Sequence, residues 1–176
     1  MKKENIKSKK GFTIIEVVLV LAIAGLIFLM VFVALPALQR SQRDTQRRDD
    51  MARFLSQLNQ YQANNGGKVP TATKAGYDKF IADYLRVQTD STQTNTAQDQ
   101  FVDPSGQNYN VASVTPCESG TNKCSQASTS DDYKSGNIRV YTNATCDGEN
   151  PKYLKGERKV AITYKLEGAG TYCGSN

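Results

Sequence analysis

The segment KKGFTIIEVVLVLAIAGLIFLMVFVALPAL, residues 9–38, decides how this chain is organised. Its last 22 residues, Val17–Leu38, carry no charge. At about 1.5 Å per residue they would form a helix of roughly 33 Å, long enough to cross a bilayer core of about 30 Å. A secretory signal peptide has a shorter apolar region followed by a small-x-small cleavage site, and Leu35–Gln39 is a poor site of that kind. The segment therefore predicts a membrane-crossing helix.

Three details set this segment apart from a plain membrane anchor. Glu16 places a carboxylate at the edge of the apolar run, where a charge is costly, so it should have a partner. A basic tail meets the apolar run abruptly, through the single residue Gly11. Pro36 removes one backbone donor and frees the carbonyl of Phe32, which predicts a bend or a locally open hydrogen-bond ladder.

The residues Lys9-Lys10-Gly11-Phe12-Thr13-Ile14-Ile15-Glu16-Val17 resemble the class III signal of type IV prepilins and pseudopilins. The shared pattern is a short basic leader, a glycine, a phenylalanine, and a glutamate as the fifth residue of the mature chain. The resemblance covers only the N-terminal segment. It implies that a membrane-embedded prepilin peptidase removes residues 1–11 as a leader peptide, cutting between Gly11 and Phe12, and then methylates the new amino group of Phe12.

The resemblance also supplies a partner for Glu16. After cleavage Phe12 would carry a cationic amine, and Glu16 of one subunit could pair with the Phe12 amine of a neighbour in a filament. The two residues also lie at i and i+4 of one helix, so a pair within one chain is geometrically possible. A wrong register would leave the charge unpaired, so we expect Glu16 to fix subunit stagger during filament assembly. Local melting of the helix between Gly25 and Pro36 is a further implication of the resemblance.

The net charge of +5 invites a nucleic-acid interpretation, but its placement argues against one. Residues 1–11 hold five lysines and one glutamate, a net of +4, and the remaining residues carry a net of only +1. The basic character is therefore mainly a topology signal, and binding of nucleic acid stays uncertain. The positive-inside rule alone is close to a tie, and we expect a cytoplasmic N-terminus because of the leader. The competing cluster after the apolar run is Arg40, Arg43, Arg47, Arg48 and Arg53.

The helix is expected to continue beyond the apolar run. Apolar residues from Met51 to Tyr61 recur at helical spacing, and Asn64-Asn65-Gly66-Gly67 supplies a strong stop. One element would then extend from Phe12 to Asn64, with residues 12–38 as its transmembrane or filament-core half and residues 39–65 as its amphipathic half. The arginines at 40–48 would form a solvated face, a lipid-headgroup contact or a charge network between subunits.

Residues 66–176 are expected to form a globular head with an antiparallel sheet. A short helix is predicted over Gly76–Leu85, an exposed loop over Gln88–Gln100, and a turn over Phe101–Gly106. One face of the last strand would cover the helix and the other would be wet. Gly168, Gly170 and Gly174 would loosen the tail, and Cys173 could pin it down. The predicted fold class is α+β, a long N-terminal amphipathic and transmembrane helix packed on a small antiparallel sheet, as in the pilin fold. The predicted strands are Tyr109–Val114, Asn137–Thr142 and Lys159–Glu167.

The four cysteines all lie in this thin-cored head. An even count in such a domain predicts two disulfides and an oxidising exterior. We favour Cys117–Cys124, closing a small loop, and Cys146–Cys173, tying the C-terminus to a loop between strands, although the sequence allows three pairings. A zinc site is the competing interpretation, which the absence of histidine and of C-x-x-C spacing weakens. We therefore expect no metal and no cofactor.

The absence of histidine also removes the usual general base, and no nucleophile–base pair can be argued, so we expect no enzyme. The resemblance implies instead a structural pilin of an extracellular type IV pilus, serving adhesion, twitching motility or DNA uptake. Its partners would be copies of itself in a helical homopolymer, prepilin peptidase, an assembly platform with its ATPase, and the cell membrane before assembly.

Two other interpretations stay open. One is a pseudopilin or minor pilin of a type II secretion or competence system: the Asp103-Pro104 turn favours it slightly, whereas Glu16 favours a subunit within a filament shaft. The other is a monomeric single-pass protein with a membrane-anchored binding domain, which would need neither Gly11-Phe12 nor Glu16.

Overall fold

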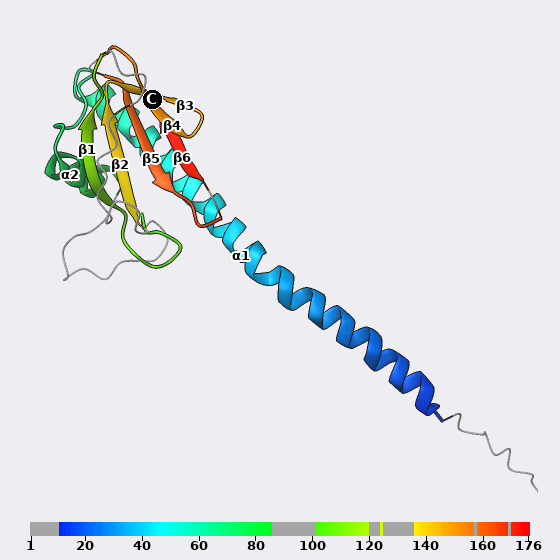
Figure 1. Cartoon of the computed structure of the whole chain (residues 1–176). Coiled ribbons are helices and arrows are strands. Elements are labelled where there is room, and N and C mark those ends of the chain that lie inside the picture. Colours follow the sequence, from blue (N-terminus) through cyan, green and yellow to red (C-terminus); the bar gives the residue numbers. More distant parts are fainter. Residues whose placement is uncertain (1–10, 86–100, 120–123, 125–135, 157, 169) are drawn as a thin grey trace, which may run out of the picture. The chain divides into compact units, whose positions relative to one another are not determined.

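The computed structural model describes residues 11–85, 101–119, 124, 136–156, 158–168 and 170–176. The leader residues 1–10 and the loop predicted over Gln88–Gln100 lie outside the described residues. Within them, two helices and six strands follow one another in the order α1, α2, β1, β2, β3, β4, β5, β6 (Figure 1). The chain divides into two compact units, residues 1–39 and residues 40–176.

The long helix α1 runs from Ile14 to Asn64, beginning two residues later than predicted and ending at the predicted residue. Its first hydrogen bonds are accepted by the carbonyl of Thr13. Beyond its end, Gly66 and Gly67 have φ of 64° and 81°, the left-handed region that glycine adopts without a steric cost. The N–H of Gly67 donates to the carbonyl of Gln62 at 2.7 Å, which satisfies one of the last carbonyls of the helix.

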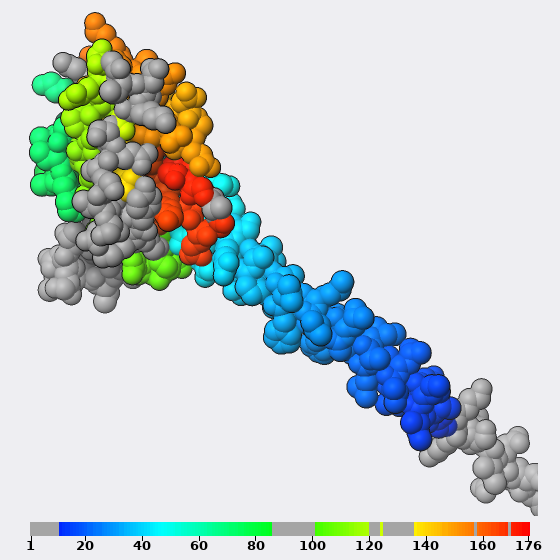
Figure 2. Space-filling model, viewed as in Figure 1, coloured from blue at the N-terminus to red at the C-terminus, as the bar shows by residue number. Residues whose placement is uncertain are grey.

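In the unit of residues 1–39, α1 carries apolar side chains on all sides, and they are exposed. Its large apolar side chains are exposed along the whole run, between 85% at Ile14 and 43% at Leu35, and the blue segment of Figure 2 shows this surface. By length and composition, the helix can cross a membrane. It remains helical through both Gly25 and Pro36.

The head, residues 40–176, holds a four-stranded sheet in the order β1-β2-β5-β6. Antiparallel pairing joins β2 (Asn137–Thr142) to β5 (Val160–Lys165), and β5 to β6 (Thr171–Ser175). The edge strand β1 (Asn110–Pro116) lies parallel to β2. A parallel neighbour needs a crossover rather than a tight turn, and the 20 residues between β1 and β2 provide the necessary length. The three predicted strands are thus confirmed, with small shifts at their ends.

The main core lies between the second half of α1 and the inner face of the sheet. Met51, Phe54 and Leu58 of α1 are fully buried at helical spacing. The second helix, α2 (Lys74–Tyr84), confirms the short helix predicted in this region and adds Phe80 and Ile81 to the core. Its N-cap is Thr73, whose side chain accepts a hydrogen bond from a backbone N–H of the first turn at 3.1 Å. The sheet completes the core with Ile138, Val140, Val160, Ile162 and Tyr164.

The outer face of β5 is covered over its first part, so the prediction of a wet outer face is wrong there, whereas Lys165 at the end of the strand is exposed as predicted. Ala161 and Thr163, which alternate with the inner-facing residues of β5, are only 0% and 5% exposed. A hairpin of β3 (Ala144–Asp147) and β4 (Asn150–Tyr153) packs with Ala161 and Tyr141 in a second, smaller cluster. The sequence predicts a loop here, although Gly148, with φ of 62° at the first position of the two-residue turn Gly148-Glu149, is a hairpin signal.

The C-terminal residues form strand β6, so the prediction of a loose tail is also wrong. The final residue, Asn176, is bonded on several sides: its side chain accepts from the N–H of Val160 at 2.8 Å and donates to Gln62 of α1 at 3.0 Å. The strand packs closely at Gly174. A Cβ at that position would lie 2.6 Å from the Tyr172 hydroxyl and 2.7 Å from the Leu55 side chain on α1, so both side chains would have to move.

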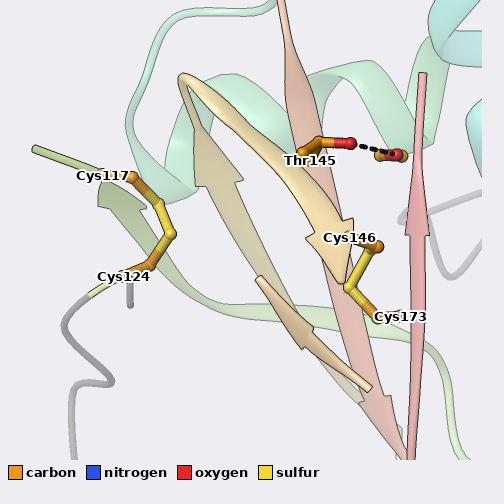
Figure 3. Close-up of a disulfide and its surroundings, with 6 residues drawn as sticks. Cys117, Cys124, Thr145, Cys146 and Cys173 are labelled. Atoms are coloured by element: carbon orange, nitrogen blue, oxygen red, sulfur yellow. Dashed lines mark hydrogen bonds between the residues drawn. A yellow bond between two sulfur atoms is a disulfide. The ribbon is translucent and has the colours of Figure 1, made fainter. Parts of the chain in front are cut away.

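Two disulfides, Cys117–Cys124 and Cys146–Cys173, join the cysteines in the favoured pairing (Figure 3). The first is buried in the cluster beneath the hairpin. The second joins β3 to β6, and a contact of 3.2 Å between the hydroxyls of Thr145 and Ser175 lies beside it. The hairpin and the C-terminal strand are therefore held to each other covalently.

We predict that the two disulfides differ in their contribution to stability. Loop closure in the unfolded chain makes Cys146–Cys173, with a sequence separation of 27, worth about 3.5 kcal/mol, and Cys117–Cys124, with a separation of 7, worth about 2 kcal/mol. Replacing the first pair by serines should therefore lower the free energy of unfolding more than replacing the second. Urea unfolding of the two double variants in the same detergent measures this. An equal loss, or a larger loss for Cys117–Cys124, would contradict the prediction.

Candidate functional site

The first candidate site is the N-terminal end of the apolar unit. Gly11 and Phe12 precede the helix and are exposed, with Phe12 at 85%. No described atom lies within 4 Å of where a Cβ on Gly11 would be, chain neighbours aside. The bond between Gly11 and Phe12 is therefore accessible and lies outside regular secondary structure.

Glu16 lies in the first turn of α1, with its carboxylate exposed. The hydroxyl of Thr13 donates to one carboxylate oxygen at 3.5 Å, a long contact. Among the described residues no cationic side chain pairs with Glu16. The free N–H groups of the helix terminus favour a negative charge there, but they do not neutralise it. An acid next to an exposed apolar surface is thus available to a partner with a positive charge.

The apolar side chains of Ile14–Leu38 form a long surface that no other part of the described chain covers. None of its most apolar stretch is buried. An exposed apolar patch of this size requires a membrane or a protein partner. Gly25 and Pro36 lie within it, and the predicted melting between them stays a proposal for the assembled state.

The second candidate site is a buried charge cluster in the head, centred on Arg47 of α1. The Arg47 side chain is 1% exposed. Its Nε and Nη2 donate to the two carboxylate oxygens of Asp103 at 2.7 and 2.9 Å, a bidentate pair. Its remaining contacts are Nη1 to Asp44 at 3.0 Å and Nη2 to Glu167 at 2.7 Å. One guanidinium therefore joins the helix to the turn before β1 and to the residues after β5.

Asp103 is fixed by its own local structure. It begins the turn predicted over Phe101–Gly106, in which the N–H of Gly106 donates to the Asp103 carbonyl at 2.7 Å. Its carboxylate also accepts from the N–H of Ser105 at 2.8 Å and from the hydroxyl of Tyr164 at 2.6 Å. The carboxylate, whose side chain is fully buried, is thus held by donors from Arg47, Ser105 and Tyr164.

Asp44 makes a different connection to the end of β5. Its two carboxylate oxygens accept the backbone N–H groups of Glu167 and Gly168 at 2.9 and 2.8 Å. Glu167 also accepts from Arg43 at 2.9 Å at the exposed edge of the cluster. The polypeptide that leads from β5 into β6 is therefore clamped to α1 by charge-assisted hydrogen bonds.

These contacts set the ionisation of the cluster. Burial opposes ionisation of Asp103 and Asp44, but hydrogen bonds from Arg47 and from backbone N–H groups outweigh it and hold the pKa of each below its ordinary value of 3.8. The hydrogen bond from Arg47 lowers the pKa of Glu167 from 4.5. Asp50 differs: burial raises its pKa, although the Tyr109 hydroxyl donates to it at 2.9 Å.

The sequence did not predict this cluster. The arginines at 40–48 were expected to form a solvated face, a lipid-headgroup contact or a charge network between subunits, whereas Arg47 is buried inside the head. A signal was present: Asp44 and Arg47 lie three residues apart and continue, toward the N-terminus, the helix face that carries Met51 and Phe54. Their carboxylate partners come from distant parts of the chain, and no local pattern identifies those. The four cysteines are all in disulfides, and no group of metal-ligating side chains occurs among the described residues.

Comparison with known proteins finds one match. Residues 6–32 match the family model described as the prokaryotic N-terminal methylation motif, which is the class III signal peptide of type IV pilins. The match contains Gly11, Phe12, Glu16 and Gly25, and it ends before the head begins. No curated protein and no solved structure matches the chain.

We predict that Arg47→Met destabilises the head by about 3–5 kcal/mol, because it leaves the carboxylate of Asp103 buried without its cation. Urea unfolding measures the loss. Arg48→Met, at the neighbouring exposed position, is the matched control and should change stability by less than about 0.5 kcal/mol. The double variant Arg47→Met/Asp103→Asn should recover part of the loss, since the fully buried position 103 then carries no charge. An Arg47→Met variant as stable as Arg48→Met would show that the cluster contributes nothing to stability.

We also predict acid sensitivity. Asp103, Asp44 and Glu167 have lowered pKa values in the folded state, so the unfolded state binds protons more readily. Their contribution is complete above about pH 4.5 and is lost as the pH falls below that value. The raised pKa of Asp50 acts in the opposite direction and offsets part of the loss. Urea unfolding between neutral and acidic pH should show a steeper acid decline for the unmodified chain than for Arg47→Met; equal slopes would contradict this origin.

Proposed function

We propose that this type IV pilin-like prepilin is a structural subunit of an extracellular type IV pilus, used in adhesion, motility or DNA uptake. The observation that carries the proposal is the matched signal at residues 6–32 followed at once by a bare apolar helix. Such a helix has two environments that satisfy it, the membrane before assembly and other copies of itself afterwards. The role of the subunit is structural, and the reactions that process it are carried out by partner proteins.

The first step is processing by prepilin peptidase. The peptidase cuts between Gly11 and Phe12 on the cytoplasmic side and methylates the Phe12 amine. The exposure of both residues and their position before the first helical turn support this step. Glycine suits the site because it lets the backbone lie extended in a tight active site. The N-terminus therefore lies in the cytoplasm, and the head lies outside.

The second step is assembly. The new amine of Phe12 is a cation, and Glu16 is an exposed acid without a cationic partner among the described side chains. In an apolar filament core each charge needs the other, and a pair between neighbouring subunits is formed only in the correct register. Gly25 and Pro36 are the positions at which the helix melts in the filament. An assembly platform and its ATPase supply the work of extraction from the membrane.

A pseudopilin or minor pilin is the second candidate, because the matched signal is common to both. The Asp103-Pro104 turn is the observation that favours it. In this chain, however, the turn presents Asp103 to Arg47, so it has a structural role within the head. The number of copies of this subunit in the filament separates the two candidates, since a pilus shaft needs many copies.

The proposal is tested by intact-mass analysis of protein sheared from the cell surface, without reduction. The expected chain begins at a methylated Phe12 and is about 4 Da lighter than its all-thiol mass, because of two disulfides. Glu16→Ala should be processed in the membrane yet be missing from the sheared fraction, because its Phe12 amine has no acid to pair with. Gln42→Ala, an exposed polar position of the same helix, is the control and should shear normally.

Each failure has its own meaning. A chain that still begins at Met1 and stays in the membrane would overturn the filament proposal. Normal filaments from Glu16→Ala would refute only the pairing of Glu16 with Phe12.

A further inference from the structure

The structure gives different roles to the arginines that follow the apolar run. Arg47 is buried among carboxylates. Arg43 lies at the surface, its side chain 41% exposed, and shares Glu167 with Arg47. Arg40 is exposed, and no carboxylate among the described residues pairs with it. The charge cluster thus uses Arg47 fully and Arg43 in part, and it leaves Arg40 free.

The two arginines at the surface, Arg40 and Arg43, lie close to the end of the apolar run. Arg40 and Arg43 are two and five residues beyond Leu38 on the same helix, about 3 and 7.5 Å along its axis. The headgroup layer beyond a bilayer core is about 5–7 Å thick. Side chains on a helix lean toward its N-terminus, which here is the direction of the apolar run. Both guanidinium groups can therefore reach this layer, whereas Arg48 lies about 15 Å beyond Leu38.

The surroundings of these two arginines favour an anion. No acidic residue occurs in the sequence from Val17 to Arg43. The next one, Asp44, uses its carboxylate on Arg47 and on two backbone N–H groups. Arg40 and Arg43 lie about 60° apart around the helix, so they project from one side. A guanidinium matches the oxygens of a phosphate with two parallel hydrogen bonds.

We propose that Arg40 and Arg43 form a binding site for anionic phospholipid headgroups in the outer leaflet, which holds the subunit in the membrane before assembly. Arg40 is the primary contact, and Arg43 exchanges between Glu167 and a lipid phosphate. This site explains how an arginine cluster can follow a membrane-crossing helix on the side opposite the leader. The proposal rests on the membrane stage of the proposed function, and filament formation is not required for it.

The test uses the full chain in phosphatidylcholine vesicles that contain a minority of phosphatidylglycerol. Electron paramagnetic resonance compares the share of spin-labelled phosphatidylglycerol and of spin-labelled phosphatidylcholine immobilised by the protein. A basic residue at an anionic surface contributes ~1 kcal/mol, so the preference for phosphatidylglycerol should fall about fivefold for Arg40→Gln and further for Arg40→Gln/Arg43→Gln. The leader lysines contribute equally in every variant.

The matched control is Arg48→Gln/Arg53→Gln, which removes two positive charges from the same helix beyond the headgroup layer. It should keep the preference of the unmodified chain. Arg40→Gln leaves the Glu167 contacts intact, so its result cannot come from a damaged head. An unchanged preference in Arg40→Gln and in the Arg40→Gln/Arg43→Gln variant, or an equal fall in the control, would overturn the proposal. Flotation with the vesicles tests membrane insertion separately, and a chain that fails to float would remove the premise itself.

Discussion

One helix has to satisfy two different surroundings, and the rest of the structure follows from that constraint. In its first half, α1 exposes apolar side chains on every side. In its second half it presents one apolar face, with Met51, Phe54 and Leu58 fully buried. The head is therefore built around a helix that it does not enclose completely. A sheet and a second helix cover one face of α1, and the opposite face keeps the polar residues seen in the sequence.

Arg47 shows how the head is fixed to that helix. Removing a guanidinium and a carboxylate from water costs several kcal/mol for each ion, and the attraction between them repays this cost only with good geometry. Here the bidentate pair with Asp103, the contacts to Asp44 and Glu167, and the Tyr164 hydroxyl satisfy both ions. Apolar contacts alone would tolerate sliding of the sheet along the helix. The charge cluster does not, because a shift of one residue leaves a buried charge unpaired.

The sequence predicted those features that depend on local patterns. The apolar run, the helical spacing from Met51 to Leu58 and the glycines at 66 and 67 were sufficient to place α1 almost to the residue. The alternation of apolar and polar residues was likewise sufficient to predict strands β2 and β5. The hairpin β3–β4 and strand β6 were missed because their strands are only four and five residues long and rich in turn residues. Their pairing is decided by contacts with β5 and by Cys146–Cys173, and no local period records such contacts. The interior position of Arg47 depends on Asp103 and Glu167 in the same way. At the other end of the chain the signal is almost entirely local: nine residues were sufficient to predict the N-terminal motif that residues 6–32 match.

The chain after β5 has no helix of its own and few large apolar residues, so it is held by other means. Asp44 binds the backbone of Glu167 and Gly168 where the strand ends. Cys173 ties the middle of β6 to β3, and Asn176 returns hydrogen bonds to Val160 and to Gln62 of α1. These attachments are charge-assisted hydrogen bonds, a covalent bond and a set of amide hydrogen bonds, and they lie at the start, middle and end of one short segment. A thin core supplies little hydrophobic stabilisation, and directional bonds of this kind compensate for it. They also respond to different conditions, since acid weakens the first and reducing agents break the second, so neither condition alone releases the segment. A subunit proposed to leave the membrane and function outside the cell has reason to secure its last strand in more than one way.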